Sequence, residues 1–171
     1  MDPALILLRV VHIGSAMLWF GGAVIGTFYL APITKALGPA AQPFLDAMTR
    51  RGIGILFPTA AALTVLSGAA FYWRDSGGLQ IAWITSPSGL AFTAGGLAAF
   101  ASFVGGMILV GPSMAAQSAV QNELARSGRG TPDAGQQARL DRADRLMQLA
   151  TRIDFPLIAF AALTMAVGRY L

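Results

Sequence analysis

Cysteine is absent from this 171-residue chain, and charged residues are scarce. The lack of thiols excludes disulfides, iron–sulfur clusters and thiolate metal sites. Charged residues make up 12% of the chain and hydrophobic residues 55%, whereas soluble domains carry about 25% charged residues. The composition therefore predicts a protein of the lipid bilayer. The net charge of +4 does not indicate a nucleic-acid partner, because the basic residues flank apolar runs.

Four apolar runs are long enough to form membrane helices, which need about 20 residues each. They cover residues 4–31, 53–73, 90–110 and 155–170. The first run is too long for the apolar core of a signal peptide and has no basic segment before it, so we expect no cleaved signal peptide. No internal repeat is apparent. The pattern predicts an all-α membrane protein with a single domain, a four-helix transmembrane bundle.

Basic residues cluster in alternate connections between these runs. Only Arg9, Arg74 and Arg169 lie elsewhere; the first and third connections hold Lys35, Arg50, Arg51, Arg126, Arg129, Arg139, Arg142, Arg145 and Arg152. The positive-inside rule predicts that these two connections are cytoplasmic. We therefore expect a multi-pass protein of the bacterial cytoplasmic (inner) membrane with both termini outside.

The third connection, about residues 112–154, is too long for plain coil in a compact protein. We expect a cytoplasmic helical extension in which the ends of helices three and four protrude from the membrane. Thr131 followed by Pro132 predicts the start of the fourth helix, with the threonine as its cap.

Small residues spaced by four predict where the helices pack closely, because membrane helices associate through close approach of their backbones. Such rows are expected to be buried, and they occur on all four helices. They comprise Gly22 and Gly26; Ala60, Thr64 and Gly68; Ala94, Ala98, Ser102 and Gly106; and Ala162 and Ala166.

The only histidine lies in "LRVVHIGSAMLWFGG", residues 8–22. His12, Ser15 and Trp19 share a helix face with Gly22, which places His12 on the bundle side, and Arg9 lies one turn further out. One interpretation is structural, a hydrogen bond from His12 to Thr59, Thr64, Ser67 or a backbone carbonyl. The others are functional: binding of haem, copper or quinone, or a proton relay, at a ligand-binding or proton-relay site of His12, Ser15, Trp19 and Arg9.

A single histidine limits the cofactors. A bis-histidine haem within one chain is excluded, whereas a histidine–methionine pair remains open for haem or for Cu(I), with His12 and Met17 as candidate metal ligands. No catalytic residue is indicated. No acidic residue lies inside a span, so a proton-driven pump is not expected.

Two segments carry a family resemblance: residues 8–22 followed by "APITKA", and "RRGIGILFPTAAALTVLSGAAFYW". They resemble the opening helices of small bacterial four-helix membrane proteins, namely copper-resistance D-type domains, HemJ-type protoporphyrinogen oxidases and uncharacterised proteins of similar pattern. The resemblance covers about the first 75 residues, and it is carried by His12, Trp19, Gly21, Gly22, Pro32, Arg50, Arg51, Ser67 and Gly68.

This chain departs from both named groups. It is poorer in histidine and methionine than the copper-resistance proteins, and it has no intramembrane lysine of the HemJ type. The resemblance is closest to the uncharacterised members. We therefore expect a non-enzymatic membrane protein that binds a hydrophobic or metal-containing ligand at the His12 face, or that serves as an accessory subunit or homo-oligomer. The alternatives are a haem- or porphyrin-linked oxidoreductase and a copper transport or tolerance protein.

Overall fold

The computed structural model describes residues 2–128 and 130–171. Arg129, one of the nine basic residues that predict the orientation, lies outside the described residues. The described part of the chain is almost entirely helical and holds no strand. The helical runs long and apolar enough to cross a membrane are Pro3–Leu37, Ile53–Asp75, Pro87–Ser127 and Ala134–Gly168. The prediction of an all-α, four-span membrane protein is confirmed.

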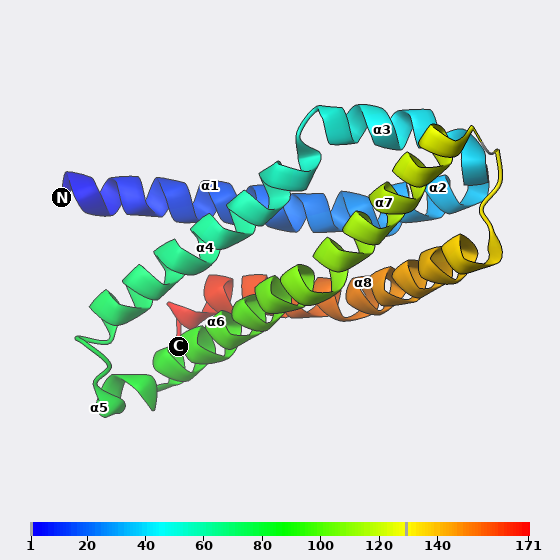
Figure 1. Ribbon diagram of the computed structural model, residues 1–171. Coiled ribbons are helices and arrows are strands. Elements are labelled where there is room, and N and C mark those ends of the chain that lie inside the picture. The colour runs from blue at the N-terminus through cyan, green and yellow to red at the C-terminus, as the bar shows by residue number, and fades with distance from the viewer. Residues whose placement is uncertain (1, 129) are drawn as a thin grey trace. The chain divides into compact units, whose positions relative to one another are not determined.

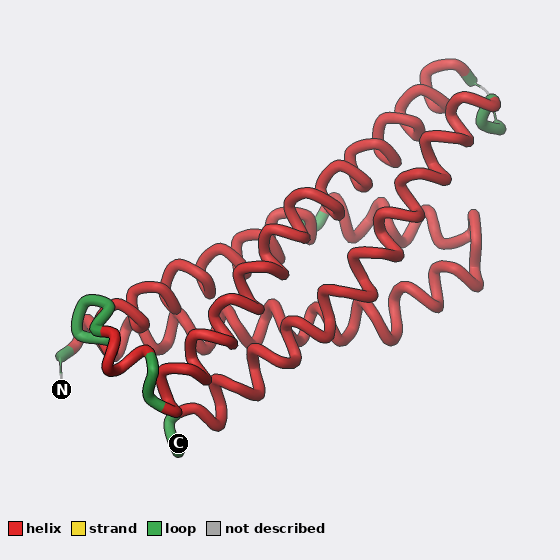
Figure 2. The backbone as a smooth tube through the Cα atoms, turned by 90° about the horizontal axis from the view of Figure 1, so that it is seen from below, coloured by secondary structure: helices red, strands yellow, loops and turns green. Residues whose placement is uncertain are grey.

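The chain divides into two compact units, Met1–Phe103 with Phe155–Leu171, and Val104–Asp154. In the first unit, the start of α1 (Pro3–Ile25), the short helix α5 (Ile81–Ile84) and the C-terminus lie at one end (Figure 1). Helices α2 (Ala31–Leu37) and α3 (Gln42–Arg50) lie at the other end (Figure 1). Figure 2 shows loops only as short connections between helices and at the ends of the chain.

The remaining elements complete this order. A 3₁₀ turn, η2 (Gly38–Ala41), precedes α3, and Gly52, with φ of 81°, joins α3 to α4 (Ile53–Asp75). Only glycine adopts such a left-handed conformation without steric cost. After α5 the chain continues through α6 (Pro87–Gly105), η3 (Gly106–Val110), α7 (Gly111–Ser127) and α8 (Ala134–Gly168).

Two helices pass a proline by widening one turn into a π-helix. In η1 (Gly26–Leu30), just before Pro32, the Ala31 N–H donates to the Gly26 carbonyl; in η3, just before Pro112, the Gly111 N–H donates to the Gly106 carbonyl. A proline ring clashes with the carbonyl four residues back in a regular α-helix, and the wider turn removes that clash. Both helices therefore continue past their prolines.

The core of the first unit is made mostly of small side chains. Most large aliphatic residues point outward, as Met17, Ile55 and Leu66 do, with exposed fractions of 70%, 74% and 67%. This distribution suits a bilayer, where apolar side chains face lipid and small residues let the backbones approach. The buried cluster comprises Trp19, Ala60, Ala61, Ala98, Ala99, Ile158 and Ala161.

The predicted small-residue row on α6 is only half right. Ala98 and Ser102 are buried, but Ala94 is exposed, and a Cβ built at Gly106 would meet no atom within 4 Å. A row spaced by four turns by about 40° per step around a helix of 3.6 residues per turn, so its ends leave the contact face. The buried face instead follows Gly95, Ala98, Ala99 and Ser102.

The same correction applies elsewhere. Ala162 and Ala166 on α8 are exposed, whereas Ala161 and Gly168 are buried. Gly26, like Gly106, has open space where its Cβ would be, so neither glycine is needed for helix packing. Gly22 does pack closely, since a Cβ there would lie 2.0 Å from Phe57 Cε1.

The structure reveals a repeat that the sequence did not make apparent. Helices α1 and α6 share equivalent positions 80 residues apart, and α4 and α8 share positions 100 residues apart. A Cβ at Gly68 would meet the ring of His12 on α1, and a Cβ at Gly168 would meet the ring of Phe92 on α6. The two π-turns also lie 80 residues apart.

A second contact follows the same offsets. The Thr64 hydroxyl lies 2.9 Å from Ser15 Oγ, and a Cβ at Gly95 would lie 2.3 Å from Thr164 Oγ1. The segments "AALTVLSG" (61–68) and "AALTMAVG" (161–168) carry these contacts. The helix pairs α1–α4 and α6–α8 are therefore built on one plan. The repeat escapes the eye in the sequence because Phe92 replaces His12 and Gly95 replaces Ser15.

The second unit is a helical hairpin of α7 and the first part of α8. Arg139 Nη1 donates to Glu123 Oε1 over 2.9 Å, and Gln117 donates to Asp144 over 3.0 Å. Helix α8 begins at Ala134, and Asp133 caps it by accepting from the Gln136 N–H, so the prediction of a Thr131 cap is wrong by two residues. Glutamine three residues beyond the cap returns a bond to the Asp133 N–H, as in a capping box.

Candidate functional site

His12 lies between α1 and α4, in the first helix pair. Its Nδ1 is 3.1 Å from the Thr64 carbonyl oxygen and 3.0 Å from Ser67 Oγ. The ring packs against the bare backbone of Gly68, where a Cβ would lie 3.0 Å from Cε1. The Phe71 ring meets it edge-on, with centroids 5.7 Å apart. The contact to α4 is the one that the structural interpretation of the sequence predicts.

These contacts assign the position of the histidine proton. A carbonyl oxygen only accepts, so Nδ1 must donate to Thr64. The Ser67 hydroxyl donates its own proton back to the Leu63 carbonyl, over 2.5 Å, and so accepts from Nδ1 as well. In the neutral ring, Nε2 then carries the lone pair.

The second ring nitrogen of His12 is Nε2. Among residues 2–128 and 130–171, no group forms a hydrogen bond with it. Every fully buried side-chain nitrogen or oxygen in this part of the chain has a partner. Since Nε2 has none, it is accessible, and its lone pair is open to a ligand.

The other predicted site residues are Ser15, Trp19 and Arg9, and they lie in three different surroundings. Ser15 is buried beside His12; its hydroxyl accepts from Thr64 and donates to the Val11 carbonyl over 2.6 Å. Trp19, two turns along, belongs to the buried core. Arg9 is exposed and is not among the hydrogen-bond partners of His12. The structure thus joins His12 and Ser15 and separates Trp19 and Arg9 from them.

The sequence predicted some of the α4 residues that contact His12. Thr64 and Ser67 contact His12, but Thr59 is exposed and is not a partner. Phe71 was not expected, although it lies one turn beyond Ser67. An aromatic residue on an apolar helix carries no sequence signal for such a contact, because aromatic residues also face lipid.

The metal ligands inferred from the sequence do not come together. Met17 is five residues from His12, about 140° around the helix, and its side chain is 70% exposed. No group of three or more His, Cys, Asp or Glu residues that could hold a metal ion occurs in the described residues. Of the two candidate metal ligands, His12 alone remains, and it offers a metal-containing ligand one nitrogen, Nε2.

The second helix pair shows that His12 is not needed for the helices to cross. Phe92 takes its place against Gly168, and Val167 takes the place of Ser67. Trp83 of α5 stacks on Phe92, with ring centroids 6.3 Å apart and planes 8° apart. In the second pair, the aromatic rings of Phe92 and Trp83 occupy the position that corresponds to His12 in the first pair.

Comparison of the chain with protein-family models, with curated proteins and with solved structures finds no match.

Proposed function

We propose that this chain is a non-enzymatic, multi-pass protein of the bacterial cytoplasmic membrane that binds one hydrophobic ligand at His12. The observation that carries this proposal is the accessible Nε2 lone pair of His12 in a helix pair whose counterpart packs with Phe92 instead. The hydrogen bonds to α4 use Nδ1 alone, so they do not account for the second nitrogen, Nε2. The resemblance of residues 8–22 to the copper-resistance D-type and HemJ-type group is in keeping with a ligand at this helix.

The chemistry of His12 Nε2 limits the kinds of ligand that can bind there. Nε2 accepts a hydrogen bond from a hydroxyl, such as that of a quinol, or coordinates one open position of a metal already held in a macrocycle, such as haem iron. A copper ion held by side chains alone fits poorly, because Cu(I) favours several soft ligands and His12 offers one nitrogen. His12 lies on a helix long and apolar enough to cross a membrane, which suits a ligand that partitions into lipid.

A haem- or porphyrin-linked oxidoreductase is the second candidate, and the same nitrogen favours it. His12 Nε2 is the atom that would hold haem, and Phe71 and Gly68 would fix the orientation of the His12 ring. The chemistry of electron transfer would come from the iron. The role of this chain would be to bind and orient the macrocycle and to shield it from water.

The test compares His12→Phe with the wild type in detergent-purified protein. His12→Phe copies the second helix pair, so we expect unchanged helicity and thermal stability. The absorption spectrum detects haem, elemental analysis detects copper, and mass spectrometry of an organic extract detects a quinone. Loss of the bound compound in His12→Phe, with Met17→Leu as an unchanged control, supports the proposal.

Two results would count against it. A wild-type protein that carries no such compound, and a His12→Phe variant that unfolds well below it, would make His12 a purely structural residue. Retention of the compound in His12→Phe would move the binding site elsewhere. Co-purification of another membrane protein that depends on His12 would instead favour the role of accessory subunit.

A further inference from the structure

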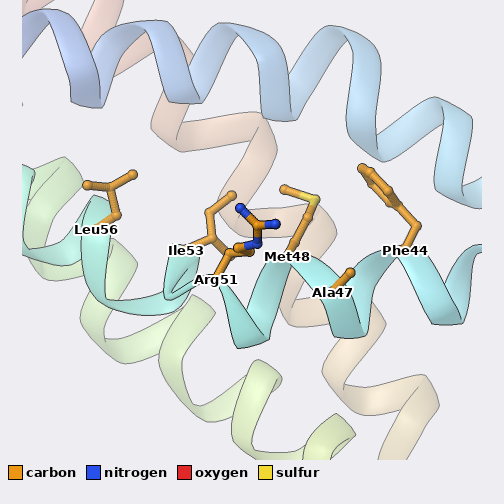
Figure 3. Close-up of a pocket in the computed structure, with 6 residues that line it drawn as sticks. All are labelled: Phe44, Ala47, Met48, Arg51, Ile53 and Leu56. Carbon is orange, nitrogen blue, oxygen red and sulfur yellow. The ribbon is translucent and has the colours of Figure 1, made fainter.

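A groove lies at the end of the first unit opposite the termini, where α3 meets the start of α4. It measures about 300 Å³ and is lined by Phe44, Ala47, Met48, Arg51, Ile53 and Leu56. The lining is apolar except for Arg51. Figure 3 shows these side chains projecting from the same side of the α3–α4 segment.

Helix α3 has the character of a helix that lies in a membrane interface. Phe44 and Leu45 are 49% and 38% exposed, whereas Asp46 and Arg50 lie on its polar side. The Gln42 amide donates to Asp46 over 2.8 Å. Such helices bury apolar side chains at the boundary between headgroups and acyl chains. The candidate span of α4 begins at Ile53, a residue that lines the groove, so the groove lies at the end of a membrane-spanning segment.

Arg51 gives the groove its charge. No hydrogen bond or ion pair of its guanidinium occurs within the described part of the chain. The one carboxylate of α3, Asp46, does not line the groove. A guanidinium presents paired donors that match a phosphate. This apolar groove, with one guanidinium at its rim that no carboxylate neutralises, is complementary to an acyl chain that ends in an anionic headgroup.

We propose that this groove binds an anionic phospholipid, with one acyl chain over Phe44, Met48 and Leu56 and the phosphate at Arg51. Basic pockets at helix ends bind acidic headgroups in this manner. The site is separate from His12, and the proposal does not depend on the ligand proposed there. A zwitterionic lipid fits the apolar channel equally well but presents no net charge to Arg51.

The experiment is native mass spectrometry of the full chain in detergent, with phosphatidylglycerol or phosphatidylcholine of identical acyl chains. We expect the wild type to prefer phosphatidylglycerol by about fivefold, the value for one basic residue near a membrane surface. Arg51→Gln should remove the preference. Arg50→Gln is the matched control, since it removes the same charge one residue away from the groove and should leave the preference within about twofold.

Ala47→Trp tests whether lipid binding requires the open space of the groove. The indole would fill the groove, so binding of both lipids should fall while charge is unchanged. Equal loss of preference in Arg50→Gln and Arg51→Gln would overturn the proposal and leave only general attraction to a basic surface. Absence of preference in the wild type would overturn it too. If Ala47→Trp does not fold by circular dichroism, the arginine pair decides alone.

Discussion

The adjacent glycines Gly95 and Gly96 on α6 offer a direct test of how the helices pack. A Cβ at Gly95 would lie 2.3 Å from Thr164 Oγ1 and 3.4 Å from the Ala161 carbonyl oxygen, whereas a Cβ at Gly96 would meet nothing within 4 Å. Gly95→Ala must therefore displace Thr164 or move α8. Gly96→Ala adds a methyl group to open space.

The expected magnitude follows from these distances. The Thr164 hydroxyl already donates to carbonyls of its own helix, 2.9 Å to Phe160 and 3.0 Å to Ala161, so rotating it away loses that bond. Overpacking of this kind typically costs about 1–3 kcal/mol. Both substitutions gain the same helix propensity of alanine over glycine, about 1 kcal/mol. The two variants should thus differ by about 1–3 kcal/mol in the free energy of unfolding.

Thermal unfolding in detergent, followed by circular dichroism, measures the difference. For a chain of this length, about 1 kcal/mol corresponds to about 2–4 °C, so Gly95→Ala should melt about 2–12 °C below Gly96→Ala. Adding Thr164→Ala removes the hydroxyl and should recover most of the loss, a coupling that a double-mutant cycle quantifies. Equal melting temperatures for the two glycine variants would refute the close approach of α6 and α8.

Three further predictions concern other parts of the chain. A Cβ at Gly22 would lie 2.0 Å from Phe57 Cε1, whereas a Cβ at Gly21 would meet open space, so Gly22→Ala should melt below Gly21→Ala. The difference in melting temperature should be smaller than at Gly95, because the half-buried Phe57 ring can rotate away. Equal melting temperatures would contradict the α1–α4 contact. A C-terminal reporter active only in the cytoplasm should be silent, because nine of the twelve basic residues lie in alternate connections, and activity would reverse the proposed orientation. Hydrogen bonds from Arg139 and Gln136 lower the pKa of Glu123 below its ordinary value of 4.5. The ionised Glu123 therefore stabilises the α7–α8 hairpin above pH 4.5, and this stabilisation is lost as the pH falls through the lowered pKa. Hydrogen exchange at the hairpin should become faster at low pH in the wild type and not in Glu123→Gln.

The His12 site could be predicted in part from the sequence. Gly22 lies two helical turns beyond Ser15 on the same side of the helix, and this predicted that His12 is on the packed face. The expected partners were Thr59, Thr64, Ser67 or a backbone carbonyl, and the structure shows the Thr64 carbonyl and the Ser67 hydroxyl. The proton position, the accessible Nε2 and the edge-on Phe71 could not be predicted. They depend on the rotation of α4 about its axis and on its height relative to α1.

The sequence by itself determined that this protein crosses a membrane with four helices, because the length and apolarity of a span are properties of a single continuous segment. Only the tertiary structure decided which side of each helix faces its neighbours. In water, a buried face stands out from a polar one, but in lipid both faces are apolar and hydrophobicity does not distinguish them. Shape makes the choice instead, so that a Cβ at Gly95 would collide with Thr164, whereas a Cβ at Gly96, one residue and about 100° away, would meet no atom within 4 Å.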